Sequence, residues 1–203
     1  MQPPEPHLVL LHADTVPREF FADFTDAVRA ERLEVLVQSR PSGVPFAAIE
    51  WLMPTAIVAY LAKPYFESFL KEMGKDHYGL VKEGMKKLYA RVAGPAAPEV
   101  SLVSTAGKVD KEQQYSLFFS IVIGGPEGNR FKLLIPRPIT EIEYALAIDA
   151  FLEFAERLHS RSLDKDFVTA LEAIPNVGQT ILVVYDVAGK HIKPIDPLAG
   201  HRR

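Results

Sequence analysis

The chain of 203 residues contains no cysteine and a single tryptophan, Trp51. Without cysteine it cannot form disulfides, thiolate zinc sites, iron–sulfur clusters or a cysteine nucleophile. A large excess of one charge is also missing, because the formal net charge is only -3. Dedicated nucleic-acid binders usually carry a basic excess that displaces counterions. The composition therefore argues against nucleic acid as a partner.

Long hydrophobic runs are scarce as well. In the apolar segment 44–70, the central stretch 51–62 is free of charge, but it is only twelve residues long. Crossing a bilayer takes about 20 apolar residues, and a run of 10 to 14 is more typical of a buried core helix. We therefore expect 44–70 to form core helix pieces, with membrane association through this segment as an alternative. The short apolar run 8–11 lacks a preceding basic stretch, so we expect a cytoplasmic protein.

What is present is the composition of an ordinary globular protein, with 48% hydrophobic and 24% charged residues. A chain of this length buries about 70% of its unfolded surface, so it needs no metal or disulfide for stability. We expect one domain over residues 1–203. The Pro- and Gly-rich stretch 94–98 is a possible subdomain hinge, and residues 194–203 are expected to form an extended tail.

Hydrophobic periodicity predicts an α/β or α+β fold with a mixed sheet. Its first part is a β-α-β unit, with strands over 7–12 and 33–38 and an apolar helix stripe that includes Phe24 and Val28. If the two strands pair directly, they must be parallel. The expected order after that unit is a central helical segment over 46–92, a β-meander with strands over 100–104, 116–123 and 131–135, a long helix, a short helix over 164–173 and a closing strand over 180–185.

Two local signals in the second half of the chain are specific. Residues 124–130 contain three glycines and an asparagine between two strand patterns, which favours a hairpin loop. Thr140 and Glu143 have the spacing of a capping box, in which each side chain binds a backbone amide at the start of a helix. The long helix is therefore predicted to begin directly after Thr140.

No strong catalytic or nucleotide-binding motif occurs in the sequence. The best-placed polar cluster follows the first strand, where His12 could act as a general acid or base and Asp14 could orient it. Thr15 is the candidate ligand-binding residue there, because ligands of open α/β sheets bind beyond strand ends. The alternative is structural: Asp14 or Thr15 caps the next helix, and His12 is a partly exposed strand end.

Charge is distributed unevenly along the chain. Basic residues outnumber acidic ones over 63–91, seven to four, and acidic residues outnumber basic ones over 141–172, eight to three. Such helices could bind a protein partner or a second copy head-to-tail. They could also be solvated faces that touch within the monomer. The candidate interaction residues are Lys82, Lys86, Lys87, Glu153 and Glu156.

The histidines show no metal-ligand spacing, so we expect no metal, and no motif indicates a cofactor. The absence of a catalytic constellation favours a non-catalytic interaction or regulatory domain acting in a protein assembly, with a small ligand at the end of the first strand as a further expectation. The first alternative is a small cytoplasmic hydrolase or transferase that uses His12 and Asp14. The second is the membrane-associating protein described above.

Overall fold

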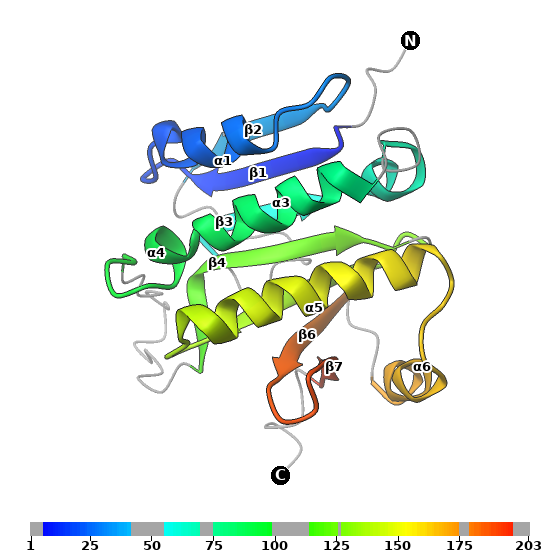
Figure 1. Ribbon diagram of the computed structural model, residues 1–203. Coiled ribbons are helices and arrows are strands. Elements are labelled where there is room, and N and C mark those ends of the chain that lie inside the picture. Colours follow the sequence, from blue (N-terminus) through cyan, green and yellow to red (C-terminus); the bar gives the residue numbers. More distant parts are fainter. Residues whose placement is uncertain are drawn as a thin grey trace.

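A computed structural model of the chain describes residues 6–41, 55–69, 75–98, 114–125, 127–174 and 179–196. Within them, seven strands form one mixed sheet of order β2-β1-β3-β4-β5-β6-β7, which confirms the predicted mixed α/β fold (Figure 1). The strands are β1 (Leu8–Ala13), β2 (Val35–Arg40), β3 (Ile57–Leu61), β4 (Tyr115–Gly124), β5 (Arg130–Pro136), β6 (Thr180–Asp186) and β7 (His191–Ile195). The helical elements are η1 (Arg18–Phe21), α1 (Ala22–Ala27), η2 (Tyr65–Phe69), α3 (Lys75–Lys87), α4 (Tyr89–Val92), α5 (Glu141–His159) and α6 (Lys165–Glu172).

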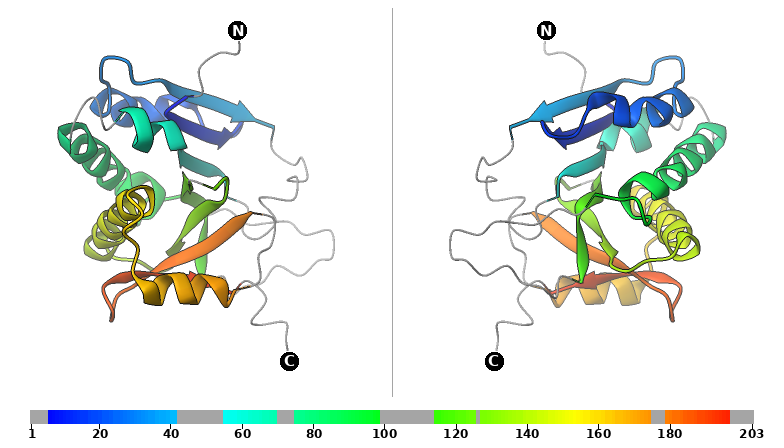
Figure 2. Two further views of the ribbon diagram at one scale, coloured as in Figure 1. Left: turned by 90° about the vertical axis from the view of Figure 1, so that its right-hand side faces the viewer. Right: turned by 90° about the vertical axis from the view of Figure 1, so that its left-hand side faces the viewer.

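The helices α1, α3 and α5 lie side by side across one face of the sheet (Figures 1 and 2). Their apolar stripes and the facing strand residues form one continuous core. Phe24 of α1, Met85 of α3 and Phe151 of α5 are each at most 2% exposed. The short helix α6 lies at the β7 end of the sheet.

The N-terminal β-α-β unit forms as predicted. β1 and β2 are parallel, with a register that runs from Leu8 opposite Val35 to Ala13 opposite Arg40. The helical connection is split into the 3₁₀ helix η1 and the single short helix α1, and it ends before Glu31. Phe24 and Val28 are buried as expected. Neither Asp14 nor Thr15 caps the helix as expected. Pro17 is the N-cap residue, and no side chain makes a capping hydrogen bond there.

The prediction of helix pieces over 46–92 is wrong between residues 57 and 61, where β3 pairs with β1 and β4. Four of the five β3 residues are buried, so both faces of this strand are covered and its sequence reads as an apolar run without period. That run resembles a buried helix of the same length. Farther along, the helical prediction is confirmed: α3 buries Tyr78, Val81 and Met85 on one side.

The hairpin and the long helix are both where the sequence places them. β4 and β5 are antiparallel, and Gly124 lies opposite Arg130 at the turn. At the start of α5, the Glu143 N–H donates to Thr140 Oγ1 at 3.2 Å, and the Thr140 N–H donates to Glu143 Oε2 at 2.9 Å. The capping box is therefore formed. These contacts lower the pKa of the Glu143 carboxyl, chiefly through the Thr140 backbone N–H.

The chain does not close with the strand over 180–185. A tight turn returns it as β7, which pairs antiparallel with β6. Pro194 and Ile195 therefore belong to an edge strand, not to an extended tail. An edge strand tolerates proline because it leaves one row of backbone groups unpaired. The strand expected over 100–104, Trp51 and residues 197–203 lie outside the described residues.

His159, at the end of α5, joins the helix layer to the β4–β5 turn. Its Nε2–H donates to the Gly124 carbonyl at 2.8 Å, and its ring stacks on Phe66 with centroids 4.5 Å apart. Burial lowers the pKa of His159, and the bond to Gly124 only partly opposes that effect. The folded protein therefore favours the neutral ring.

Acidification should destabilise the fold through this histidine. Because its folded pKa is below the unfolded value of about 6.5, the unfolded chain takes up the proton first, and stability falls as pH drops below that value. We expect His159→Leu to flatten the loss of unfolding free energy between about pH 7 and 5. Urea titrations of both proteins across that range measure the difference. A difference that does not change with pH would contradict the assignment.

Candidate functional site

The first predicted site, at the end of β1, is not an open cluster. His12 is only 4% exposed, its Nδ1 lies 3.0 Å from the Ala13 carbonyl oxygen, and its ring is 5.2 Å from the Phe21 ring. The expectation of a partly exposed histidine is therefore wrong. Asp14 and Thr15 are exposed in the turn that follows. The catalytic and ligand-binding roles of these three residues stay predictions that no measurement here addresses.

Two of the predicted interaction residues contact the acidic helix within the same chain. Lys86 Nζ lies 2.9 Å from Asp149 Oδ2 and 3.1 Å from Glu83 Oε1. Lys82 Nζ lies 3.8 Å from the same Asp149 and 5.1 Å from the centre of the Tyr78 ring. Partial burial alone would lower the pKa of Lys86, but its hydrogen bonds to the two carboxylates raise it. The basic helix and the acidic helix therefore contact each other within one chain, as the structural alternative for their charges expects.

The remaining interaction candidates are exposed. Lys87 points away from the core at the end of α3, and Glu153 and Glu156 lie on the outer side of α5. Their role in binding a partner stays a prediction. Glu153 also lines a groove that sequence reasoning did not find.

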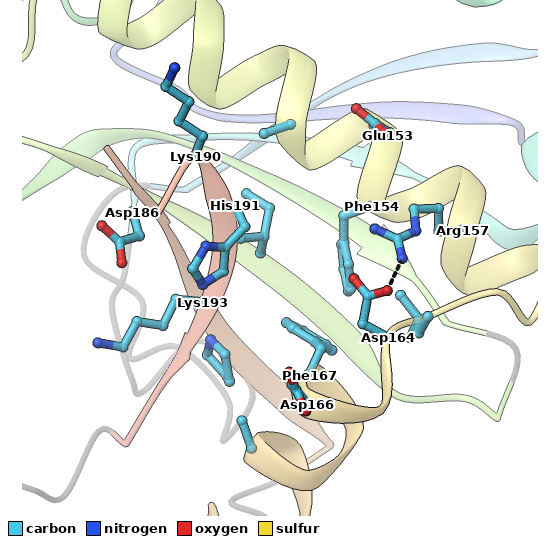
Figure 3. Close-up of a pocket in the computed structure, with 15 residues that line it drawn as sticks. Glu153, Phe154, Arg157, Asp164, Asp166, Phe167, Asp186, Lys190, His191 and Lys193 are labelled. Carbon is cyan, nitrogen blue, oxygen red and sulfur yellow. Dashed lines mark ion pairs between the residues drawn. The ribbon is translucent and has the colours of Figure 1, made fainter. Parts of the chain in front are cut away.

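This groove lies between α5, α6 and β7 and has a volume of about 530 Å³ (Figure 3). Its floor is apolar, and charged side chains stand around it. The lining residues are Ala150, Glu153, Phe154, Arg157, Leu163, Asp164, Asp166, Phe167, Ala170, Asp186, Lys190, His191, Ile192, Lys193 and Pro194.

The helix side of the groove is held by aromatic packing and one ion pair. The Phe154 and Phe167 rings are 4.9 Å apart, which fixes α6 against α5. Arg157 donates through Nε and Nη2 to the Ser162 carbonyl at 3.3 and 3.2 Å, and its Nη2 is 2.6 Å from Asp164 Oδ1. Arg157 therefore fastens the loop between the two helices. The charge of Asp164 is already balanced within the chain.

The strand side is built by the β6–β7 turn. Asp186 Oδ1 accepts from the Gly189 N–H at 3.3 Å and the Ala188 N–H at 3.0 Å, and these bonds lower the pKa of the Asp186 carboxyl. Lys190 then takes a positive φ of 54° and reverses the chain. In β7, exposed and buried positions alternate, so His191 and Lys193 face outward while Ile192 is buried.

Basic side chains therefore gather on the β7 side of the groove. His191 projects toward the groove, whereas the Lys190 and Lys193 side chains start at its edge and extend away from the helix side (Figure 3). Asp186 keeps its negative charge, but Lys190 and Lys193 outnumber it, so the strand side has an excess of positive charge. Across the apolar floor, Arg157 and Asp164 form an ion pair, and Glu153 and Asp166 give the helix side an excess of negative charge.

The described polar contacts of the groove hold its own walls together. Among its described lining residues, the polar contacts are the Arg157 bonds on the helix side and the Asp186 turn bonds, and neither joins a nucleophile to a general base. General acid–base catalysis requires such groups within hydrogen-bond reach of each other or of substrate. Apolar floors with a few placed polar groups are typical of ligand and peptide sites.

Two features are missing from the described parts of the chain. No three His, Asp or Glu side chains there converge in a way that could hold a metal ion. No helix there is long and apolar enough to cross a membrane. Comparisons with protein-family models, with curated proteins and with solved structures found no match to this chain.

Proposed function

We propose that the chain is a non-catalytic interaction domain that binds a segment of a partner protein in the groove between α5, α6 and β7. The observation that carries the proposal is the combination of a partly exposed aromatic floor with a basic wall. Phe167 and Leu163 are half-buried and line the floor, so they offer apolar surface to an incoming side chain. Hot spots of protein interfaces are commonly apolar anchors in such pockets.

The charges define the chemistry of the bound segment. Lys190, His191 and Lys193 stand on one wall, whereas the other wall pairs Arg157 with Asp164 and also carries the acidic Glu153 and Asp166. A carboxylate beside the apolar anchor would face the basic wall and gain favourable electrostatic energy. The expected partner segment therefore carries a large apolar residue followed or preceded by an Asp or Glu. Binding of such a segment requires no catalytic group from this chain.

Selection from a displayed library of random peptides tests this proposal. The immobilised full chain is expected to enrich peptides that pair an aromatic or large aliphatic residue with a nearby acidic residue. Phe167→Asp, which places a charge on the floor, should enrich none of them. The double variant Lys190→Glu, Lys193→Glu should select basic residues at the flanking position instead.

Two outcomes would overturn the proposal. One is a library that yields the same peptides from the wild type and from Phe167→Asp. The other is a library from which the wild type enriches nothing. Circular dichroism of each variant, together with its melting temperature, establishes that the substituted proteins are folded before selection.

A further inference from the structure

A row of apolar side chains runs along α5 from the surface into the groove described above. Its members are four residues apart, so each lies beside the next on the helix surface. They are Ile142, Leu146, Ala150 and Phe154, and we call them the α5 row. Ile142 is 74% exposed and Leu146 is 45% exposed, whereas the other two members line the groove. The apolar floor therefore continues as exposed surface toward the start of α5.

The exposed part of the α5 row has the form of a helix-packing surface. Single exposed apolar residues are common on proteins, but contiguous ones mark interaction surfaces. The capping box at Thr140 lies two residues before Ile142, so these side chains stand on a well-formed helix end. Rows of residues four apart are the ridges by which one helix packs against another. A second helix would therefore fit this side of α5.

The charges beside the groove also indicate the form of the bound segment (Figure 3). Glu153 and Asp166 stand on the helix side, and Lys190 and Lys193 stand at the strand edge. A bound segment thus meets an apolar floor, an acidic side and a basic side. A strand directs its side chains to two opposite faces, whereas successive side chains of a helix point about 100° apart. A helix can therefore present side chains to all three surfaces at once.

Pairing of an added strand with β7 is disfavoured. β7 is an edge strand of the sheet and forms one wall of the groove. Strand addition gains its affinity from main-chain hydrogen bonds to such an edge. Pro194 has no N–H to donate, and Lys193 is exposed, and both residue types protect the edges of natural sheets. The bound segment is thus expected to contact β7 through side chains.

We propose that the partner segment is an amphipathic helix that packs along the α5 row, an inference that rests on the proposed function because it names the form of the segment bound in the groove. One large apolar side chain of this helix enters the groove against Phe154 and Phe167. Others on the same stripe, at spacings of about three, four and seven residues, cover Leu146 and Ile142. The apolar surface that α5 exposes is then buried in the complex.

The flanks of the apolar stripe carry opposite charges in this arrangement. Acidic residues on one flank face Lys190 and Lys193, and basic residues on the other flank face Glu153 and Asp166. Complementary charges of this kind fix the direction and register of a bound helix more than its affinity. The partner is therefore a helix with one apolar stripe between an acidic and a basic side.

Peptide selection with the full chain tests the form of the segment. The library consists of random peptides of about 16 residues, which make a helix of about 24 Å. Large apolar residues in the selected peptides are expected to recur every three to four positions, as on one face of a helix. Mixing a selected peptide with the protein should add helical circular dichroism signal beyond the sum of the separate spectra. Apolar residues that alternate with a period of two, or no gain of helical signal, would overturn the inference.

Two leucines of similar exposure test the α5 row. Leu80 of α3 is 47% exposed, against 45% for Leu146, and it neither belongs to the row nor lines the groove. Leu146→Asp is expected to raise the Kd of a selected peptide at least about tenfold, which corresponds to about 1.4 kcal/mol. Leu80→Asp should leave the Kd within about twofold. Ile142→Asp repeats the measurement at a second position of the row, and circular dichroism establishes that each variant is folded.

The outcomes separate the helix from the groove itself. If Phe167→Asp abolishes binding but Leu146→Asp and Ile142→Asp weaken it no more than Leu80→Asp does, a segment occupies the groove without covering the α5 row. That result overturns the helix inference and leaves the proposed function standing. If the library yields no peptide, or if Phe167→Asp has no effect on binding, the proposed function fails and the helix inference fails with it.

Discussion

Replacing Phe151 with alanine is expected to lower the free energy of unfolding by about 3 to 5 kcal/mol, the usual cost of removing a buried phenylalanine. Its side chain is 0% exposed and belongs to the core beneath α5. The Phe151 and Phe154 rings are 6.1 Å apart, so the substitution also removes an aromatic contact. Urea denaturation followed by circular dichroism measures the change.

A residue on the opposite side of the same helix provides the control. Ile142 is 74% exposed, and we expect Ile142→Ala to change stability by less than about 0.5 kcal/mol, as surface substitutions usually do. Similar losses for the two variants would mean that α5 buries a different face. An unchanged stability of Phe151→Ala would contradict the core described above.

Replacing His77 with phenylalanine is expected to cost about 1 to 3 kcal/mol, because a buried polar group loses its hydrogen-bond partner. His77 is 4% exposed, and its Nε2 donates to the Val28 carbonyl of the α1 end at 2.8 Å. Its Nδ1 lies 3.2 Å from the Tyr65 hydroxyl. One side chain of α3 therefore ties together α1 and η2, and phenylalanine keeps the ring but not these bonds.

Replacing the adjacent residue, Tyr78, is expected to have the opposite effect on stability. The Tyr78 hydroxyl is buried and has no hydrogen-bond partner among the described residues. Burial raises the pKa of Tyr78, and the Glu156 carboxylate adds to the effect. We expect Tyr78→Phe to leave stability unchanged or to raise it, since the buried hydroxyl then needs no desolvation. Thermal denaturation of the two variants compares neighbours on one helix. A larger loss for Tyr78→Phe than for His77→Phe would contradict these assignments.

Local signals in the sequence predicted those parts of the fold that local contacts determine. The capping box of Thr140 and Glu143 lies within one helical turn, so four residues suffice to place the start of α5. The parallel pairing of β1 and β2 follows from the short helical connection between them. The 124–130 hairpin likewise depends on adjacent residues that reverse the chain.

The errors arose where tertiary position overrides local pattern. β3 is buried between β1 and β4, and the neighbours that make it a strand are distant in sequence. For β7, Pro194 suggested an extended tail, because the sequence alone does not reveal that this strand lies at a sheet edge. The sequence contained two signals for this strand. One was the turn at Gly189, and the other was the alternation of His191 and Lys193 with Ile192.

The candidate groove could not be predicted for the same reason. Its floor joins Phe154 of α5 with Phe167 of α6, and its basic wall comes from the turn after β6. Periodicity placed Glu153 correctly on the solvated side of α5. It did not indicate which residues lie across the groove from this helix. The sequence indicated the contacts of Lys82 and Lys86 with Asp149 only indirectly, through the opposite charge excess of the two segments.

The affinity of one selected peptide for three forms of the protein tests the proposed interaction site most directly. Phe167 lines the groove, whereas its neighbour Val168 is 39% exposed and does not line it. In fluorescence anisotropy, Phe167→Asp should raise the Kd of the peptide at least about 30-fold, the effect of a hot-spot residue worth about 2 kcal/mol. Val168→Asp should leave the Kd within about twofold, a difference below about 0.5 kcal/mol. Equal weakening by both substitutions, or no weakening by Phe167→Asp, would contradict binding in the α5–α6–β7 groove.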